Sequence, residues 1–366
     1  MCKKDASIGQ SIVKLKNKNG FIEAGFGKKT LVNSLIGINH EDEHSYELEK
    51  IDKIINAVEK PDIITDLSSR RMNLRDTIWF KIANDTQYVS GSLPIYSVKS
   101  KNNHVDENEL LDIIIEQMEN KVGLVTIHPT ANKEIFDKSR KRMVPITSRG
   151  GGIVVKDLIA KGFIEENVYI KILPQIISHA RKHSVALSIG ATFRSGNIFD
   201  CNDEAQRMEI ELQIMLAKSI SQQGVGVIIE SPGHAKPRDI VEISLILRKA
   251  GFPVMPLGPI PTDIAVGMDH ISSAIGATIM GLEGCANIIA AVTREEHTGG
   301  RPTIESIIES IQVSRIAAHI IDIHNINDVN NDMLVAQTRA NSNTCVLGKN
   351  TKYCDRCQEL CPLMIK

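Results

Sequence analysis

Three cysteines near the end of the chain have the types and spacing best suited to chemistry: Cys354, Cys357 and Cys361, in the string C-D-R-C-Q-E-L-C. Three thiolates within eight residues can bind three irons of a [4Fe–4S] cluster and leave the fourth iron open. S-adenosylmethionine (SAM) can chelate that open iron and be cleaved to a radical. A zinc knuckle is the alternative, because C-x-x-C serves both metals, and Cys345, nine residues upstream, could then supply a fourth ligand.

Two histidines form a second candidate metal site. His234 follows Glu230 in the string E-S-P-G-H, and His297 lies in R-E-E-H after a later predicted strand. Two neutral imidazoles from neighbouring loops, completed by water, could hold a divalent metal. Taken singly, each histidine is more often a cap or a core residue, so the pair alone is a weak indication.

A glycine-rich string, S-R-G-G-G at residues 148–152, predicts an anion site. Glycines let backbone N–H groups approach a phosphate, a helix expected at 154–161 adds positive potential, and Arg149 can bind the anion with two hydrogen bonds. A flexible turn with a solvated arginine is the alternative. Arg194, in A-T-F-R-S-G, is typical of a substrate loop, and Asn202 or Asp203 is expected to cap the following helix.

Alternating strands and helices must position these groups. Amphipathic segments at 107–120, 167–183, 204–223 and 236–250 separate short β-branched runs. This order predicts parallel strands with right-handed crossovers and favours a (β/α)8 barrel over an open sheet. The glycines near residue 25 fit neither a dinucleotide-binding nor a Walker A pattern. Nine strands are expected, at residues 30–38, 62–67, 89–96, 122–128, 144–148, 185–189, 225–230, 254–257 and 287–292.

Several of the expected strands end in a polar or chemically capable side chain. The carboxyl ends of the strands of a barrel open onto one face, where active sites lie. A shared pocket is therefore predicted at that face. Its candidate residues are Asp66, Tyr96, His128, Ser148, Arg149, Arg194, Glu230 and His234.

Bulk properties set the class of protein. The chain has 366 residues, of which 42% are hydrophobic and 24% charged, with a net charge of −1, so nothing directs it to nucleic acid or to a membrane. Seven unevenly spaced cysteines, with no apolar leader, predict reduced thiols in the cytoplasm. The expected organisation is an N-terminal subdomain at 1–60, the α/β TIM-type barrel with the substrate and metal sites at 61–324, and a small C-terminal [4Fe–4S] domain at 325–366.

The order of these blocks resembles the thiamin pyrimidine synthase (phosphomethylpyrimidine synthase) family, a non-classical group of radical SAM enzymes. The resemblance rests on S-R-G-G-G-I, S-I-G-A-T-F-R-S-G, N-D-E-A-Q, E-S-P-G-H, the long block L-G-P-I-P-T-D-I-A-V-G-M-D-H-I-S-S-A-I-G-A, E-E-H, A-A-H and the cysteine tail. It implies a (β/α)8 barrel, a homodimer, and a cluster domain that reaches the partner subunit's active site. It also implies a carbon–carbon lyase that uses an electron donor and a 5′-deoxyadenosyl radical to rearrange 5-aminoimidazole ribotide.

Site residues are carried over from the family by position. The substrate contacts that the resemblance implies are Tyr96, His128, Ser148, Arg149, Gly150, Arg194 and Glu230, with Glu230 also the catalytic candidate. His234 and His297 match the family's zinc or iron ligands, and Cys354, Cys357 and Cys361 match its [4Fe–4S] ligands.

The chain departs from the family at several positions. Leu35, Thr65 and Met255 stand where the family has asparagine, methionine and tyrosine, residues 191–193 read Ala-Thr-Phe for Asp-Gly-Leu, and the tail is C-x2-C-x3-C rather than C-x2-C-x4-C. An altered pocket beside intact phosphate, metal and cluster residues favours the branch that makes 5-hydroxybenzimidazole, the lower-ligand base of some cobamides. The alternatives are the thiamin pyrimidine synthase itself, a non-catalytic partner of a catalytic paralogue, and a zinc-tailed barrel lyase without radical chemistry.

Overall fold

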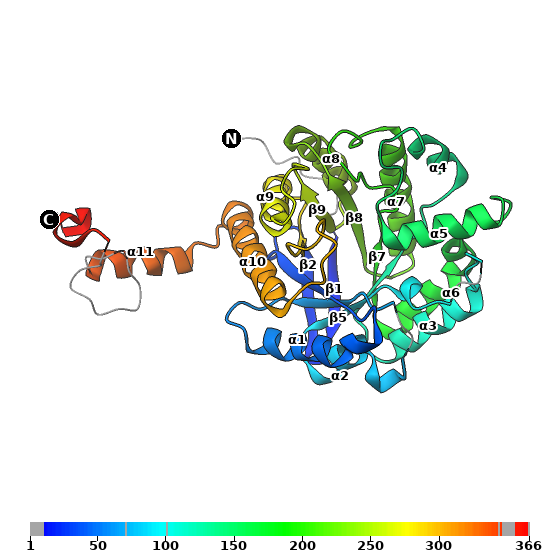
Figure 1. Ribbon diagram of the computed structural model, residues 1–366, viewed down its shortest axis with the longest axis horizontal. Helices are drawn as coiled ribbons and strands as arrows, with labels where there is room; N and C mark the ends of the chain where they lie inside the picture. The colour runs from blue at the N-terminus through cyan, green and yellow to red at the C-terminus, as the bar shows by residue number, and fades with distance from the viewer. Residues whose placement is uncertain (1–10, 70–71, 100–101, 343–344, 346–355, 365–366) are drawn as a thin grey trace.

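Parallel strands form an almost closed barrel in the computed structural model, which describes residues 11–69, 72–99, 102–342, 345 and 356–364 (Figure 1). The eight strands follow the order β10-β3-β4-β5-β6-β7-β8-β9, and the Asn287 N–H donates to the Val254 carbonyl (2.9 Å), which joins the two ends of the sheet. The strands are β3 (Leu31–Ile36), β4 (Ile63–Asp66), β5 (Val89–Ser92), β6 (Leu124–Ile127), β7 (Ala186–Ile189), β8 (Val227–His234), β9 (Val254–Ile260) and β10 (Ile288–Ala291). The predicted TIM-type barrel is confirmed.

Helices cover the outside of this barrel (Figure 1). Each buries an apolar stripe, and several begin at a side chain that caps their first turn, such as Asp203, which accepts from the Gln206 N–H (2.9 Å). The helices are α1 (His44–Asn56), α2 (Ile78–Asp85), α3 (Glu107–Glu119), α4 (Lys133–Ser139), α5 (Arg149–Ala160), α6 (Val168–His183), α7 (Glu204–Gln222), α8 (Pro237–Ala250), α9 (Asp269–Leu282) and α10 (Ile304–Ile326).

The strand predicted at residues 144–148 is wrong. This segment is a loop, and the N–H groups of Met143 and Val144 donate to the Asp200 carboxylate (3.2 and 2.9 Å). A distant side chain thus binds the amides that a neighbouring strand would otherwise use. The other eight predicted strands correspond to β3 to β10.

An antiparallel hairpin, β1 (Ile12–Asn17) and β2 (Gly20–Gly25), closes the amino-terminal end of the barrel. Val13, Leu15 and Ala24 pack against the first inward-facing residues of the barrel strands. The sequence predicted one strand within residues 1–60, whereas β1, β2 and β3 all lie there. Because β3 pairs with both β4 and β10, the barrel begins before residue 61.

A polar layer lies above this apolar base. Side chains alternate along each strand, so residues two positions beyond the base point into the barrel again. They include Asn33, Thr65, Thr126, Ser188 and Glu230, all buried. The Thr65 hydroxyl donates to Asn33 Oδ1 (2.9 Å), and the Ser188 hydroxyl donates to Glu230 Oε1 (3.0 Å). These side chains form the floor of the open, carboxyl end.

The C-terminal part of the chain leaves the barrel after α10. Helix α11 (Asn330–Ser342) buries none of its residues and extends away from the barrel in Figure 1. Cys345, Cys357 and Cys361 follow it, whereas Cys354 lies outside the described residues. In the described part of the chain, no helix has both the length and the apolarity needed to cross a membrane.

Candidate functional site

His128 lies at the open end of the barrel, just after β6. Its ring is held between two glycines: a Cβ added at Gly150 would lie 2.4 Å from His128 Cε1, and one at Gly190 would lie 2.7 Å from Cδ2. Asn167, the residue before α6, fixes the backbone here by donating from Nδ2 to the His128 carbonyl (3.0 Å). Burial, helped by the charge of Arg194, lowers the pKa of His128 from 6.5 to about 3. The ring is therefore neutral at physiological pH.

The glycine-rich string forms the first turn of α5 and faces this histidine. Ser148 caps the helix by accepting from the Gly151 N–H (3.1 Å), and its hydroxyl lies 3.4 Å from His128 Nε2. Arg149 stacks on the ring of Tyr96, with its guanidinium carbon 3.9 Å from the ring centroid, and donates to the Leu67 carbonyl (2.8 Å). A helix N-terminus and an arginine thus meet beside one imidazole.

Glu230 and Arg194 complete the group. Glu230 accepts from the hydroxyls of Ser188 (3.0 Å) and Thr126 (3.2 Å) deep in the barrel. Burial raises the pKa of Glu230, and the positive charge of Arg194 opposes that rise. Burial likewise raises the pKa of Tyr96. The structure thus brings together the seven residues that the family resemblance implies as substrate contacts.

His234 and His297 lie together on the same rim. Their Nε2 atoms are 3.2 Å apart, while Nδ1 of His234 lies 2.7 Å from Asp263 Oδ1 and Nδ1 of His297 lies 2.8 Å from Asp269 Oδ1. Each carboxylate therefore favours a proton on Nδ1 and leaves the Nε2 lone pair facing the other ring. Burial lowers the pKa of His234 and so favours a neutral ring, whereas the carboxylate of Asp263 acts in the opposite direction.

The spacing of these two nitrogens suits a metal. Two lone pairs that face each other repel unless a proton or a cation lies between them. A tetrahedral ion with bonds of about 2.0–2.1 Å separates two ligand nitrogens by roughly 3.3 Å. Carboxylates that orient ligating imidazoles through the second nitrogen are the usual outer partners of such sites. The residues therefore fit a divalent metal.

Several buried residues that hold the site were missed from the sequence. Glu209, on α7, accepts from the N–H groups of Thr192 and Phe193 (both 2.7 Å) and so fixes the loop that carries Arg194. Gln213, one turn further on, donates to the carbonyls of Ile189 and Glu230 (2.9 and 2.7 Å). Their one sequence signal is the polar residue on the buried face of an amphipathic helix.

The described part of the cysteine tail lies apart from this group within one chain. Cys357 and Cys361 flank a short helical turn, η4 (Gln358–Leu360), and both are partly buried. In Figure 1 this segment follows α11 away from the barrel. Within the described residues of a single chain, the structure thus does not bring Cys357 and Cys361 together with the barrel site.

The chain is similar in sequence to several proteins of known name. The curated relatives include phosphomethylpyrimidine synthases from Thermotoga petrophila (34% identical; 64% of this chain, 57% of that protein), Sulfurisphaera tokodaii (33%; 82% and 71%) and Desulforamulus reducens (31%; 84% and 72%). The chain thus covers just over half the length of the Thermotoga relative. The model of the radical SAM ThiC family matches residues 3–351 and so ends before Cys354. With that match spanning nearly the whole chain, this protein belongs to the radical SAM ThiC family.

Proposed function

We propose that this chain binds 5-aminoimidazole ribotide at the open end of its barrel and converts it to the phosphorylated hydroxymethylpyrimidine of thiamine biosynthesis. The observation that carries the proposal is the convergence of five side chains at the open end of the barrel: His128, Arg149, Arg194, Glu230 and Tyr96. The names of the relatives favour this product over 5-hydroxybenzimidazole.

The first turn of α5 would hold the phosphate. The N–H groups of Gly151 and Gly152 donate within the turn to Ser148. Among the described residues, the N–H groups of Arg149 and Gly150 then stay available to an anion. The Arg149 guanidinium is kept over the Tyr96 ring, so its hydrogen-bonding edge is oriented before the ligand arrives.

His128 and Glu230 would bind the sugar and the base. A neutral imidazole can both donate and accept a hydrogen bond, which suits a ribose hydroxyl. Glu230, whose pKa is raised by burial, can hold a proton and return it to a nitrogen of the ligand. The positive charge of Arg194 opposes that rise. Gln213 and Glu209 keep both strand ends in place.

Cys354, Cys357 and Cys361 would hold the [4Fe–4S] cluster, and His234 with His297 the divalent metal, zinc or iron. When bound, SAM and the cluster supply the 5′-deoxyadenosyl radical. The protein's own part is to exclude water and keep the ribotide in one orientation under that radical. Cys345 is exposed and is the alternative ligand if the tail binds zinc instead.

A second copy of the chain would bring the tail to a barrel. Helices α9 and α10 pack together and expose isoleucines, among them Ile275 (53%), Ile316 (64%) and Ile320 (44%). Helix α11 buries nothing within its own chain, and it carries exposed Met333 and Leu334. Apolar patches of this kind mark protein interfaces. The proposed assembly is a homodimer, or a heteromer with a paralogue, supplied by an electron donor in the cytoplasm.

The product 5-hydroxybenzimidazole stays a second candidate because of the barrel floor. Leu35, Thr65 and Met255 replace family polar or larger residues, and the structure places Asn33 between the last two: Thr65 donates to its Oδ1, and its Nδ2 lies 3.5 Å from Met255 Sδ. A buried partner left unpaired costs about 1–3 kcal/mol, so a changed floor can redirect how a ligand binds.

Anaerobic incubation of the reconstituted protein with SAM, a reductant and the ribotide tests the proposal. Mass spectrometry should detect hydroxymethylpyrimidine phosphate together with 5′-deoxyadenosine. The benzimidazole as sole product would support the second candidate. SAM cleavage that requires an added paralogue would instead support the non-catalytic partner.

A further inference from the structure

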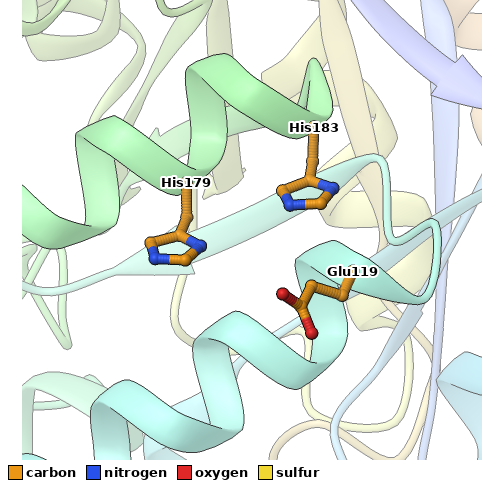
Figure 2. A group of neighbouring side chains, drawn as sticks. All are labelled: Glu119, His179 and His183. Atoms are coloured by element: carbon orange, nitrogen blue, oxygen red, sulfur yellow. The ribbon is translucent and has the colours of Figure 1, made fainter.

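A second group of metal-type ligands lies at the other end of the barrel. His179 and His183 are one turn apart near the end of α6, and Glu119 is the last residue of α3 (Figure 2). Figure 2 shows both rings and the carboxylate turned toward one space between the two helices. One ligand atom from each residue lies within 4.8 Å of the other two.

The two imidazoles are arranged to share an ion. Their rings are nearly parallel, with an interplanar angle of 4° and centroids 6.3 Å apart. His179 Nδ1 and His183 Nε2 are both buried, and neither has a hydrogen-bond partner among the described residues. A buried polar atom without a partner costs free energy, so an ion bound to these two nitrogens would remove both costs.

The surrounding charge identifies the kind of ion. The carboxyl ends of α3 and α6 meet here, and their partial negative charge favours a cation. Lys16 donates to the His183 carbonyl (3.2 Å), and the charges of Lys16 and Lys182 act on the His183 ring. Nearby lysines disfavour a hard ion that depends on carboxylate charge, whereas imidazole nitrogens suit zinc and its neighbours.

We propose that His179, His183 and Glu119 form a second divalent metal site, separate from the His234–His297 pair and selective for zinc-like ions over magnesium or calcium. Ligands around a tetrahedral zinc lie roughly 3.3–3.6 Å apart, so Glu119, which is exposed, would close on the two rings when the ion binds. Water would take the remaining position.

The bound ion would link α3 to α6 and have a structural role. Helix α3 leads to β6 and α6 leads to β7, and the Lys16 hydrogen bond links α6 to the hairpin that closes this end of the barrel. An ion shared by α3 and α6 would therefore join the ends of two helices that otherwise meet through packing and through the Lys171–Glu107 ion pair (3.6 Å) near their starts. It would stabilise the fold far from His128, without taking part in catalysis.

Zinc content and thermal unfolding of the full chain, with its cluster reconstituted, test this proposal. Four proteins are compared: wild type, H179Q/H183Q, H234Q/H297Q and the variant with all four changes. The proposal predicts that H179Q/H183Q binds one equivalent of zinc fewer than wild type, and that the fourfold variant binds one fewer than H234Q/H297Q. A hundredfold excess of free zinc over the dissociation constant should raise the Tm by roughly 3 °C in chains that keep the site.

Controls separate loss of the site from loss of the fold. H324Q replaces an exposed histidine and E166Q an exposed glutamate, and both should bind zinc like wild type. E119Q, at an exposed helix end, should weaken zinc binding even if the double histidine variant unfolds. Equal zinc content and equal Tm shifts with and without His179 and His183 would overturn the proposal. That outcome would leave the function of the His234–His297 pair untouched.

Discussion

At the scale of single residues, close packing fixes the position of the central side chain of the site, His128. His128 has no alternative position, because Gly150 and Gly190 contact both sides of its ring. The sequence made His128, Arg149 and Glu230 candidates through their positions after β-branched runs. It did not indicate Glu209, Gln213 or Asp263, because a polar residue on a buried helix face or in a loop has no distinctive local pattern.

The protonation of His128 should make stability depend on pH. Its pKa is about 3 in the folded protein and 6.5 in the unfolded chain, so only the unfolded chain takes up a proton between these values. Stability is therefore complete above pH 6.5 and is lost as the pH falls below it, by about 1.5–2 kcal/mol at pH 5. Denaturant unfolding of wild type and His128→Gln between pH 7 and pH 5 measures this. An equally steep loss in His128→Gln would assign the effect to other groups.

The Arg149 guanidinium should account for much of the ribotide affinity. Arg149→Ala removes a charge-assisted pair of hydrogen bonds and should weaken binding by about tenfold to a hundredfold. Arg149→Lys keeps the charge but loses the paired N–H donors of the guanidinium and its stacking on Tyr96. Its affinity for the ribotide should therefore lie between those of wild type and Arg149→Ala. Equilibrium dialysis with the ribotide gives the dissociation constants. The control is Arg248→Ala, at the far end of α8. An unchanged affinity in Arg149→Ala would remove the phosphate role.

At the scale of elements, strands and helices were more predictable than their ends. Eight of nine predicted strands exist, because β-branched runs buried on both faces leave a strong pattern. The hairpin of β1 and β2 was missed, because the contacts that stabilise it are with the distant strands whose barrel it closes. The segment at 144–148 was predicted as a strand, but Asp200, in a distant loop, accepts from the N–H of its first residue, Val144, and from that of the preceding Met143. Tertiary contacts of this kind cannot be deduced from local sequence.

The first turn of α5 offers a matched pair of glycines. A Cβ at Gly150 would lie 2.4 Å from the fixed ring of His128, whereas one at Gly152 meets only Ile146 Cγ2, at 4.0 Å. Gly150→Ala should cost about 1–3 kcal/mol of stability and displace His128, with loss of ribotide binding. Gly152→Ala should stabilise the helix by about 0.5–1 kcal/mol and leave binding intact. Thermal unfolding and ribotide titration compare them. Identical behaviour would show that Gly150 is not packed against the ring.

At the scale of the whole molecule, the proposed substrate site and the described part of the proposed cluster domain lie apart within one chain. The proposed substrate and metal residues lie at the open end of the barrel. Helix α11 and the described residues that follow it extend away from the barrel (Figure 1). The cysteines in the sequence predict where along the chain the cluster domain lies, but they do not predict how far it is from the barrel. That distance depends on what α11 packs against, and no residue of α11 is buried within its own chain.

Disrupting the exposed face of α9 and α10 should therefore stop turnover. Ile316→Glu with Ile320→Glu places two charges on this face and should yield monomers by sedimentation, with product formation reduced by at least about a hundredfold. Folding should be preserved, because both side chains are exposed. The control is Ile164→Glu, a 90% exposed isoleucine elsewhere. Full activity in a monomeric double variant would mean that each tail serves its own barrel.

The central claim is that this barrel presents a ribotide to a radical made at the cysteine tail. Its most direct test is an anaerobic assay with ribotide deuterated throughout the ribose, followed by mass spectrometry of the 5′-deoxyadenosine. If the 5′-deoxyadenosyl radical takes a hydrogen atom from the ribose, we expect deuterium in the 5′-deoxyadenosine from wild type. We expect none from a chain with Cys354, Cys357 and Cys361 changed to serine. Unlabelled 5′-deoxyadenosine from wild type, formed equally with or without ribotide, would contradict it.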